Sequence, residues 1–451
     1  MKLLMYKNQL FLVLVVAFVY RYFLDLSYMA ISDSYPVEFP VKPNTIKIVL
    51  SYLVIIPMIK LLCKEDSILS FLFRVIVFFT IIPLSSVYAM KDESSTFFLL
   101  TCLSFIVTEF VLFKNGNNYE RESNCLQRRN NKKLKIVRIF CFLILFLTIV
   151  LMYLQLGVPS LMALVLDDVY DLRQSFQIST YTSYILYVAT QVCIPFGIAD
   201  GYVRKSKTQI IVVILFQLVF FLWTGHKTWF FSIFLMLGII FLLSIRKSLN
   251  YLFVALTLLC AIGYYGNDNM IIGNSVTSLI NRRVLLDPAA LKYNYYDYFV
   301  VKGHSPNLVA GTVLAPLLKG AASAAEDDYS YTISDIYTDK SSNAGTGLYG
   351  GDVASVGFLV FIIVPFALFF LAFLTKRTEE FVGKNFTLLM LIYIFFSFND
   401  QRIIQYLLDI RGVFLVVTLY YLSSQQLKKR PYKIEKIDGI NRTNNLDNAK
   451  D

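Results

Sequence analysis

Histidine and cysteine are scarce in this chain of 451 residues, which has two histidines and six cysteines. The cysteines are Cys63, Cys102, Cys125, Cys141, Cys193 and Cys260. None of them lies in the polar stretch 266–353, so the sequence predicts no disulfide framework there. The histidines and cysteines also lack the spacing of a metal site, so no metal centre is predicted.

Charged residues are few as well, at 16% of the chain against 57% hydrophobic residues. Many apolar runs reach the 18 or so residues needed to cross about 30 Å of hydrocarbon, which argues against a soluble protein. We predict an all-α fold, with residues 1–451 forming one polytopic membrane domain of about twelve transmembrane helices. The predicted spans are 8–28, 45–63, 67–89, 95–113, 138–157, 180–200, 209–224, 228–244, 250–265, 354–375, 386–399 and 404–423.

The 42 lysines and arginines outnumber the 31 acidic residues and are unevenly distributed over the predicted loops. Most fall in alternate loops, above all in the basic loop 114–137 and the basic tail 424–451, which places these loops and both termini in the cytoplasm. A short loop, 158–179, and a long loop, 266–353, then lie outside. Because the basic residues are scattered loop anchors, nucleic-acid binding is not indicated. No convincing cleavage site follows the first span, so we expect a retained anchor.

The long outer loop limits the chemistry, because ATP and nucleotide-sugars are normally absent from that side of the membrane. Any substrate must therefore be delivered by the membrane. The basic residues predicted to lie outside are Arg173, Lys227, Arg282, Arg283, Lys292, Lys302, Lys319 and Arg402. Arginine binds phosphate oxygens bidentately, so this set suits a lipid-linked phosphate or diphosphate. Alternatively, the same residues pair with outer acids or touch lipid headgroups.

Three residues of the outer side are candidates for a general base. Both histidines, His226 and His304, are predicted to lie outside, and histidine is the commonest base near neutral pH. Asp297, which lies among tyrosines, is a third candidate. The alternative for the histidines is an ordinary hydrogen-bonding role at the surface.

Aromatic residues are dense in 293–299, where Tyr295 and Tyr296 are adjacent. Aromatic faces stack on sugar rings, but tyrosines also form interfacial belts in membrane proteins, and both interpretations stay open.

A Gly-rich run, 342–352, precedes a predicted span and contains Asn343, Gly345, Gly347 and Asp352. A glycine turn that leads into a helix can hold an anion on its backbone N–H groups, and Asp352 is predicted to be the N-cap. The run lacks the Gly-Lys-Ser/Thr ending of a P-loop.

Charged residues within predicted spans are costly and are functional candidates. Arg21 and Asp25 are four residues apart and are predicted to pair. Arg402, Gln405 and Asp409 have a spacing that predicts one polar face on the last span. Two further arginines have no evident partner in the sequence: Arg74 and Arg411.

Together these features resemble the Wzy-type O-antigen and capsule repeat-unit polymerases. The resemblance lies in the many-span layout with one late outer loop, and locally in 281–299 and 343–357. It implies a metal- and cofactor-free glycosyltransferase of the inner membrane, related to O-antigen ligases, that uses an undecaprenyl-diphosphate-linked oligosaccharide donor. It also implies that Arg282 and Arg283, and then Arg173, contact the diphosphate, and that a chain-length regulator and a flippase are partners.

The substrate-binding set expected from these patterns is Arg173, Lys227, Arg402, Tyr295, Tyr296, Asn343, Gly345, Gly347 and Asp352. The expected catalytic set is Arg282, Arg283, His304 and Asp297. The ligase branch resembles this layout but has a histidine close to the next span, whereas His304 lies about fifty residues before it.

Three alternatives to a polymerase stay open. An O-antigen ligase performs the same chemistry on a lipid A core acceptor. A flippase or transporter of lipid-linked oligosaccharide belongs to a different class, and no repeat in the sequence supports it. A polyprenyl-phosphate mannosyl-type transferase would use acidic residues of the first outer loop, where Asp33 and Glu38 lie.

Overall fold

The computed structural model describes residues 2–64, 67–114, 131–159, 178–265, 277–308, 329–337 and 345–424. Throughout these residues the regular structure is helical, and no strand occurs in them. The first helices are α1 (Lys2–Ser34), α2 (Thr45–Leu62), α3 (Ile68–Ile76), η1 (Val77–Ile81), α4 (Ile82–Met90) and α5 (Ser95–Phe113). The middle of the chain forms α6 (Asn131–Leu156), α8 (Thr180–Val188), η5 (Ala189–Cys193), α9 (Ile194–Arg204), α10 (Lys207–Thr224), α11 (Lys227–Ser244) and α12 (Tyr251–Tyr265).

The remaining helices belong to the late part of the chain. They are η6 (Thr277–Leu286), α14 (Asp287–Tyr296), η7 (Asp297–Val301), α17 (Tyr329–Tyr337), α18 (Gly350–Val356), η8 (Gly357–Leu359), α19 (Val360–Val382), α20 (Lys384–Ser397), α21 (Ile403–Leu408) and α22 (Ile410–Ser423). The predicted outer loop 266–353 is thus largely helical where it is described.

Among the described residues, eight helices or helical runs are long and apolar enough to cross a membrane. They are Gln9–Ser34, Thr45–Leu62, Ile68–Met90, Ser95–Phe113, Lys132–Leu156, Thr180–Arg204, Lys207–Thr224 and Gly350–Val382. Four shorter apolar helices accompany them, at Thr228–Ser244, Tyr251–Tyr265, Lys384–Ser397 and Ile410–Ser423. Each predicted span up to 386–399 overlaps one of these helices or helical runs, and the all-α prediction is confirmed for the described residues.

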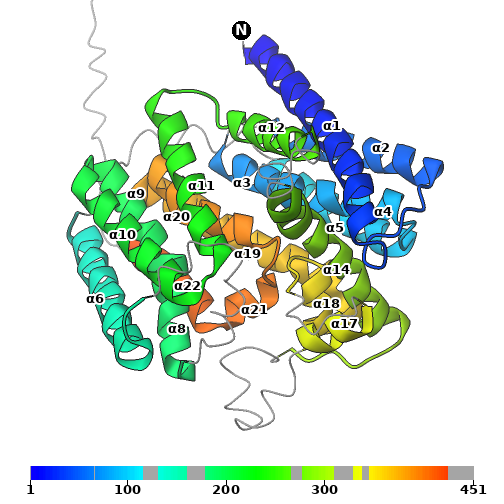
Figure 1. Ribbon diagram of the computed structural model, residues 1–451. Coiled ribbons are helices and arrows are strands. Elements are labelled where there is room, and N and C mark those ends of the chain that lie inside the picture. The colour runs from blue at the N-terminus through cyan, green and yellow to red at the C-terminus, as the bar shows by residue number, and fades with distance from the viewer. Residues whose placement is uncertain are drawn as a thin grey trace, which may run out of the picture.

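The long helices run back and forth between two ends of the bundle. We call one the loop end, where the chain turns at 34–45, 90–95, 224–227 and 397–403, and the other the basic end, where it turns at 62–68, 204–207, 244–251 and 382–384. Hydrogen bonds between distant turns fasten the loop end: Lys42 N to Met90 O (2.8 Å), Trp223 Nε1 to Gly157 O (3.0 Å) and Leu348 N to Phe398 O (2.8 Å). In Figure 1, α17, α18 and α21 lie on the opposite side of the bundle from the N-terminus.

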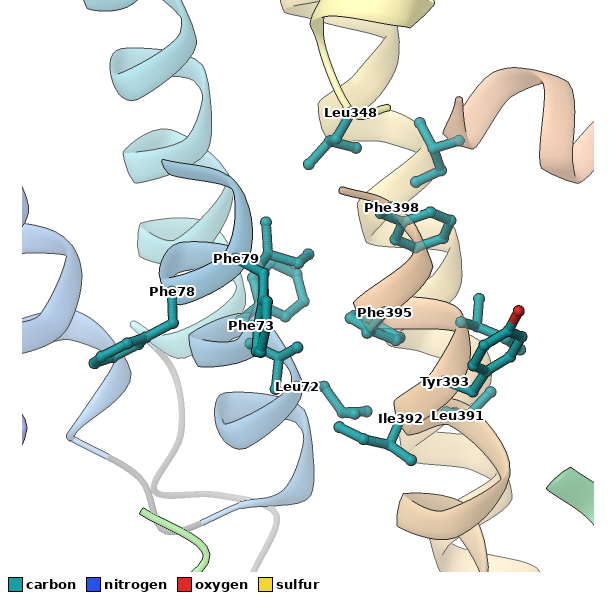
Figure 2. Packing of buried hydrophobic residues seen from close by; sticks show 14 of the residues in the cluster. Leu72, Phe73, Phe78, Phe79, Leu348, Leu391, Ile392, Tyr393, Phe395 and Phe398 are labelled. Atoms are coloured by element: carbon teal, nitrogen blue, oxygen red, sulfur yellow. The ribbon is translucent and has the colours of Figure 1, made fainter. Parts of the chain in front are cut away.

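The core lies around the run α3–η1–α4, in which every residue from Ile68 to Met90 is buried. Phe78 stacks on Phe253 of α12 with ring centroids 4.1 Å apart. The ring centroids of Phe73 and Phe395 of α20 are 6.1 Å apart. Figure 2 shows Phe73 and Leu72 facing Phe395 and Ile392 across this contact. Side chains on the outside of the bundle, such as Leu103 and Phe146, are also apolar, as is expected of a helix bundle surrounded by lipid.

Ion pairs hold polar side chains inside the bundle. The predicted pair Arg21–Asp25 is confirmed, and Ser85 accepts a further hydrogen bond from Arg21 Nε at 2.8 Å. Near the basic end, Arg138 pairs with the buried Asp200 at 2.6 Å. Glu109 differs, because neither oxygen of its buried carboxylate has a hydrogen-bond partner among the described residues.

The last predicted span, 404–423, is not one helix. The backbone of Asp409 is extended (φ −82°, ψ 160°), so α21 ends before it and α22 begins after it. The break brings Gly412 directly against the carbonyl oxygen of Tyr406, where a Cβ atom would collide. The expected single face of Arg402, Gln405 and Asp409 is therefore interrupted, a break that apolar periodicity does not reveal.

Candidate functional site

The turn 398–402, between α20 and α21, joins three segments that are distant in sequence. Lys292 Nζ of α14 donates to the carbonyl oxygen of Asn399 at 2.9 Å. The N–H of Leu348, in the Gly-rich run, donates to Phe398 O at 2.8 Å. The carboxylate of Asp352 accepts from the N–H of Ile404, in the first turn of α21, at 3.0 Å. The predicted Tyr-rich and Gly-rich segments thus meet at the turn that contains Arg402.

Glycines allow this close packing of backbone on backbone. A Cβ atom at Gly347 would collide with the backbone of Phe398 and Asn399, and one at Gly350 would collide with Lys292. Between them Tyr349 has φ 66° and ψ −62°, and Gly350 N donates to Leu348 O at 3.0 Å. These are the dihedrals and the hydrogen bond of a γ-turn with positive φ, a strained conformation for a residue with a side chain.

Asp352 lies at the third position of α18 and not at its N-cap, which is Tyr349. Its carboxylate accepts from the N–H of Tyr349 at 3.2 Å as well as from Ile404. The N–H groups of Leu348, Gly350 and Gly351 are also used, because each donates to a backbone carbonyl. The Gly-rich run therefore links α18 to α21, and these three N–H groups are not available to an anion.

Lys292, which is buried, and Asp400, which is half-buried in the turn, interact electrostatically. Lys292 is fully buried, and its Nζ also lies 3.4 Å from Pro288 O. Burial lowers the pKa of Lys292 from its ordinary value of 10.5 to about 7, although the charges of Asp400 and Asp352 oppose the shift. Burial likewise raises the pKa of Asp400 from 3.8 to about 6, with Lys292 and Arg411 opposing. Sequence reasoning missed Asn399 and Asp400, since no pattern marked the turn as a junction.

The adjacent arginines lie on η6, a π-helical segment of ten residues. Arg282 is buried, and its guanidinium lies 4.0 Å from the centroid of the Tyr35 ring, just beyond the end of α1. Arg283 is half-buried. Asn281 anchors the segment, because its Nδ2 donates to Ser27 Oγ at 2.8 Å and to Cys260 O at 3.2 Å. π-Helical segments are rare and are often found at functional sites.

The two predicted sugar-stacking tyrosines are both buried, with different neighbours. The guanidinium of Arg402 lies 5.7 Å from the centroid of the Tyr295 ring, so two predicted site residues are in contact. Tyr296 packs instead into the core, with its ring centroid 4.9 Å from that of Phe97 in α5. Gly345 is exposed at the start of the described part of the Gly-rich run.

The candidate bases lie in two places. Asp297 Oδ2 accepts from the Tyr337 hydroxyl at 2.6 Å and pairs with Lys302 at 3.1 Å. His304 lies nearby in sequence, exposed, with its ring stacked on Tyr298 at a centroid distance of 3.8 Å. His226, at the start of α11, packs against Trp229 at 4.7 Å. Two of the candidate bases, Asp297 and His304, therefore lie within ten residues of Tyr295 in the sequence.

Several predicted site residues lie outside the described residues. They are Arg173, Lys319 and Asn343. Lys227 begins α11, but its side chain is not described. In the described part of the chain, no group of three or more histidine, cysteine or acidic side chains could hold a metal ion.

Comparison with known proteins finds no family model, no curated protein and no solved structure that matches this chain. The class of the protein therefore rests on its fold, which in the described part of the chain is a helix bundle with eight helices long and apolar enough to cross a membrane.

Proposed function

We propose that the protein is a polymerase that joins undecaprenyl-diphosphate-linked oligosaccharide repeat units on the outer side of a bacterial inner membrane. One observation carries the proposal: the Tyr-rich segment, the Gly-rich run and Arg402 meet at one end of an apolar helix bundle. The loops at the other end contain most of the lysines and arginines, which supports a cytoplasmic basic end and an outer loop end. An outer site of this kind has access to lipid-linked donors but not to nucleotide-sugars.

In the proposed reaction the acceptor sugar hydroxyl attacks the anomeric carbon of the donor glycan. The bond from that carbon to the diphosphate oxygen breaks, and Arg402 stabilises the charge on the departing diphosphate, while Arg282 and Arg283 hold the diphosphate of the second lipid-linked glycan. His304 or Asp297 takes the hydroxyl proton. The product is a glycan longer by one repeat unit and a free lipid diphosphate, and no metal or cofactor enters the balance.

The spacing of these groups along one helical run constrains the proposal. Residues 283 and 297 lie on the continuous run η6–α14–η7, which separates them by roughly 20 Å at 1.5 Å per residue. Arg402 contacts the ring of Tyr295, two residues before Asp297, and so lies at the other end of this run from the η6 arginines. A polymerase binds two lipid-linked glycans at once, and separate basic groups at the two ends of this run suit two diphosphates.

The test is complementation of a strain that lacks the gene, read from a gel of its surface polysaccharide. We expect Arg283→Ala to leave single-repeat glycan and to abolish the long ladder. Arg204→Ala, which changes an exposed arginine at the basic end, should restore the ladder fully. A ladder of normal length from Arg283→Ala at normal expression would refute this role of Arg283. Polymer stranded on the lipid carrier in the deletion strain would instead indicate a ligase.

A transporter of lipid-linked oligosaccharide is the second candidate, favoured by the broken helix α21–α22 and by the buried Glu109. Discontinuous helices and charges within the membrane are common in transporters. In that case the deletion strain would retain lipid-linked single repeats facing the cytoplasm, and its core would carry no repeat.

A further inference from the structure

A second group of polar side chains surrounds Arg411, which also contacts the turn 398–402. Arg411 lies in the first turn of α22, immediately after the helix break. Its Nε is 2.9 Å from Asp409 Oδ2, and its Nη1 is 3.3 Å from Gln191 Oε1 of η5 and 3.4 Å from Gln401 Oε1. Arg411 and Asp409 stood out in the sequence, but their grouping with Gln191 did not, because Arg411 and Gln191 are 220 residues apart.

Three buried donors at this place have no hydrogen-bond partner among the described residues. They are the hydroxyl groups of Tyr393 and Tyr406 and the Nε2 amide of Gln191. Each of these side chains is at most 1% exposed. Tyr393 and Tyr406 both interact electrostatically with Arg411, and the guanidinium lies 5.3 Å from the centroid of the Tyr406 ring. Figure 2 shows the Tyr393 hydroxyl pointing away from the Phe73–Phe395 contact.

These side chains offer hydrogen-bond donors that lack an acceptor. Buried donors are almost always hydrogen-bonded in folded proteins, so three unpaired donors around one guanidinium indicate an absent partner. The N-terminus of α22 adds the positive end of a helix of 14 residues. The nearby charges are mixed, since Asp409 pairs with Arg411, and Asp400 interacts electrostatically with both Arg411 and Lys292.

We propose that Arg411, Gln191, Tyr393 and Tyr406 bind a tetrahedral oxyanion of the phosphate type at the N-terminus of α22. A phosphate group presents several acceptor oxygens, which match a planar guanidinium and three neutral donors. Asp409 competes with the anion for Arg411. The proposal goes beyond the polymerase reaction and does not depend on it, because the site is defined by binding.

The experiment uses the purified full-length chain in detergent and follows thermal unfolding while sodium phosphate replaces sodium chloride at constant ionic strength. We expect the unfolding temperature of the wild type to rise with phosphate. Arg411→Gln should lose this rise, and Arg377→Gln, near the basic end, should keep it. Asp409→Asn should respond at a phosphate concentration at least threefold lower, because Asn still caps α22 but no longer competes as a charge.

Two further arms make the test decisive. The first arm repeats the experiment in vesicles that contain polyprenyl phosphate. If the site binds the lipid phosphate, the wild type will no longer respond to added phosphate. If the site binds free phosphate, the response will stay intact. Equal responses in wild type and Arg411→Gln, or none in the wild type with or without lipid, would overturn the proposal. If Arg411→Gln does not fold, Tyr406→Phe and Asp409→Asn decide, and unchanged midpoints in both would overturn it.

Discussion

Lys292 has lost the water that normally hydrates an ammonium group. Its Nζ donates to the carbonyl oxygens of Asn399 and Pro288, and Gly350 packs against its stem. The neutral form is favoured by burial, which lowers the pKa to about 7. Between that value and the ordinary 10.5, the folded protein has lost a proton that the unfolded chain still binds. The free energy of unfolding therefore rises with pH in this window.

We predict that Lys292→Met flattens this dependence. The wild-type stability should rise relative to that of Lys292→Met between pH 7.5 and pH 9.5, by at most about 1.4 kcal/mol per pH unit. Thermal unfolding of both proteins in detergent at several pH values measures the difference. Lys302→Met is the matched control, because Lys302 is exposed and burial does not dominate its pKa, which Tyr337 and Asp297 raise. If the stabilities of the wild type and Lys292→Met changed with pH in parallel, the lowered pKa of Lys292 would be contradicted.

Single residues also show where sequence reasoning ends. Arg21 and Asp25 were predictable as a pair because both lie on one helix, four residues apart. The partners of Arg411, by contrast, come from η5, the turn 398–402 and the break at Asp409, and tertiary packing alone brings them together. Asp352 was predicted to be the N-cap of a helix, which is wrong: Tyr349 is the N-cap, and the Asp352 carboxylate, from the third position of α18, accepts from two N–H groups, one of them on a different helix.

At the scale of elements, α18 approaches α14 through a glycine. Small residues let helix backbones approach closely within a membrane bundle, where dispersion and hydrogen bonds replace the hydrophobic force. We predict that Gly350→Ala destabilises the protein by about 1–3 kcal/mol, because the new methyl group overlaps Lys292. It should also reduce polymer length in cells, since the same contact positions the turn that carries Arg402.

The control for this change is Gly238→Ala in α11. A Cβ atom there would meet no atom within 4 Å, so alanine should leave the stability unchanged or raise it by up to about 1 kcal/mol. Thermal unfolding of the two variants beside the wild type separates a steric clash from a general effect of alanine. Equal stability of Gly350→Ala and Gly238→Ala would show that α14 and α18 are not packed this tightly.

Helices were predictable from the sequence where the bilayer requires them. Helix breaks and π-helical segments, which depend on tertiary packing, were not. Long apolar runs located the helices, because a chain in hydrocarbon must satisfy its backbone internally. The break at Asp409 was missed because residues on both sides are apolar and Gly412 alone does not reveal a close approach. The π-helical segments η5 and η6 were also invisible, since insertion of one residue into a helical turn leaves no compositional mark.

At the scale of the whole molecule, the two ends of the bundle differ in chemistry. The basic end contains the loops expected to be cytoplasmic from their positive charge. The loop end contains the turn 398–402, together with Lys292 and the Gly-rich run, which are hydrogen-bonded to it. A lipid-linked donor must present its glycan at the loop end, so the proposed function requires that end to face outward. The orientation of the bundle is therefore the premise on which the proposed site and its substrate both depend.

We predict this orientation to be measurable with single cysteines in intact cells. In a variant with Cys125→Ser, Ser305→Cys at the loop end should react with a membrane-impermeant maleimide, because Ser305 is exposed next to His304. Thr208→Cys, exposed near the start of α10 at the basic end, should react only after the inner membrane is permeabilised. The five described native cysteines are buried and should stay unlabelled in both cases. The reverse labelling pattern would place the candidate site on the cytoplasmic side. It would contradict the proposed polymerase and favour a cytoplasmic activity instead.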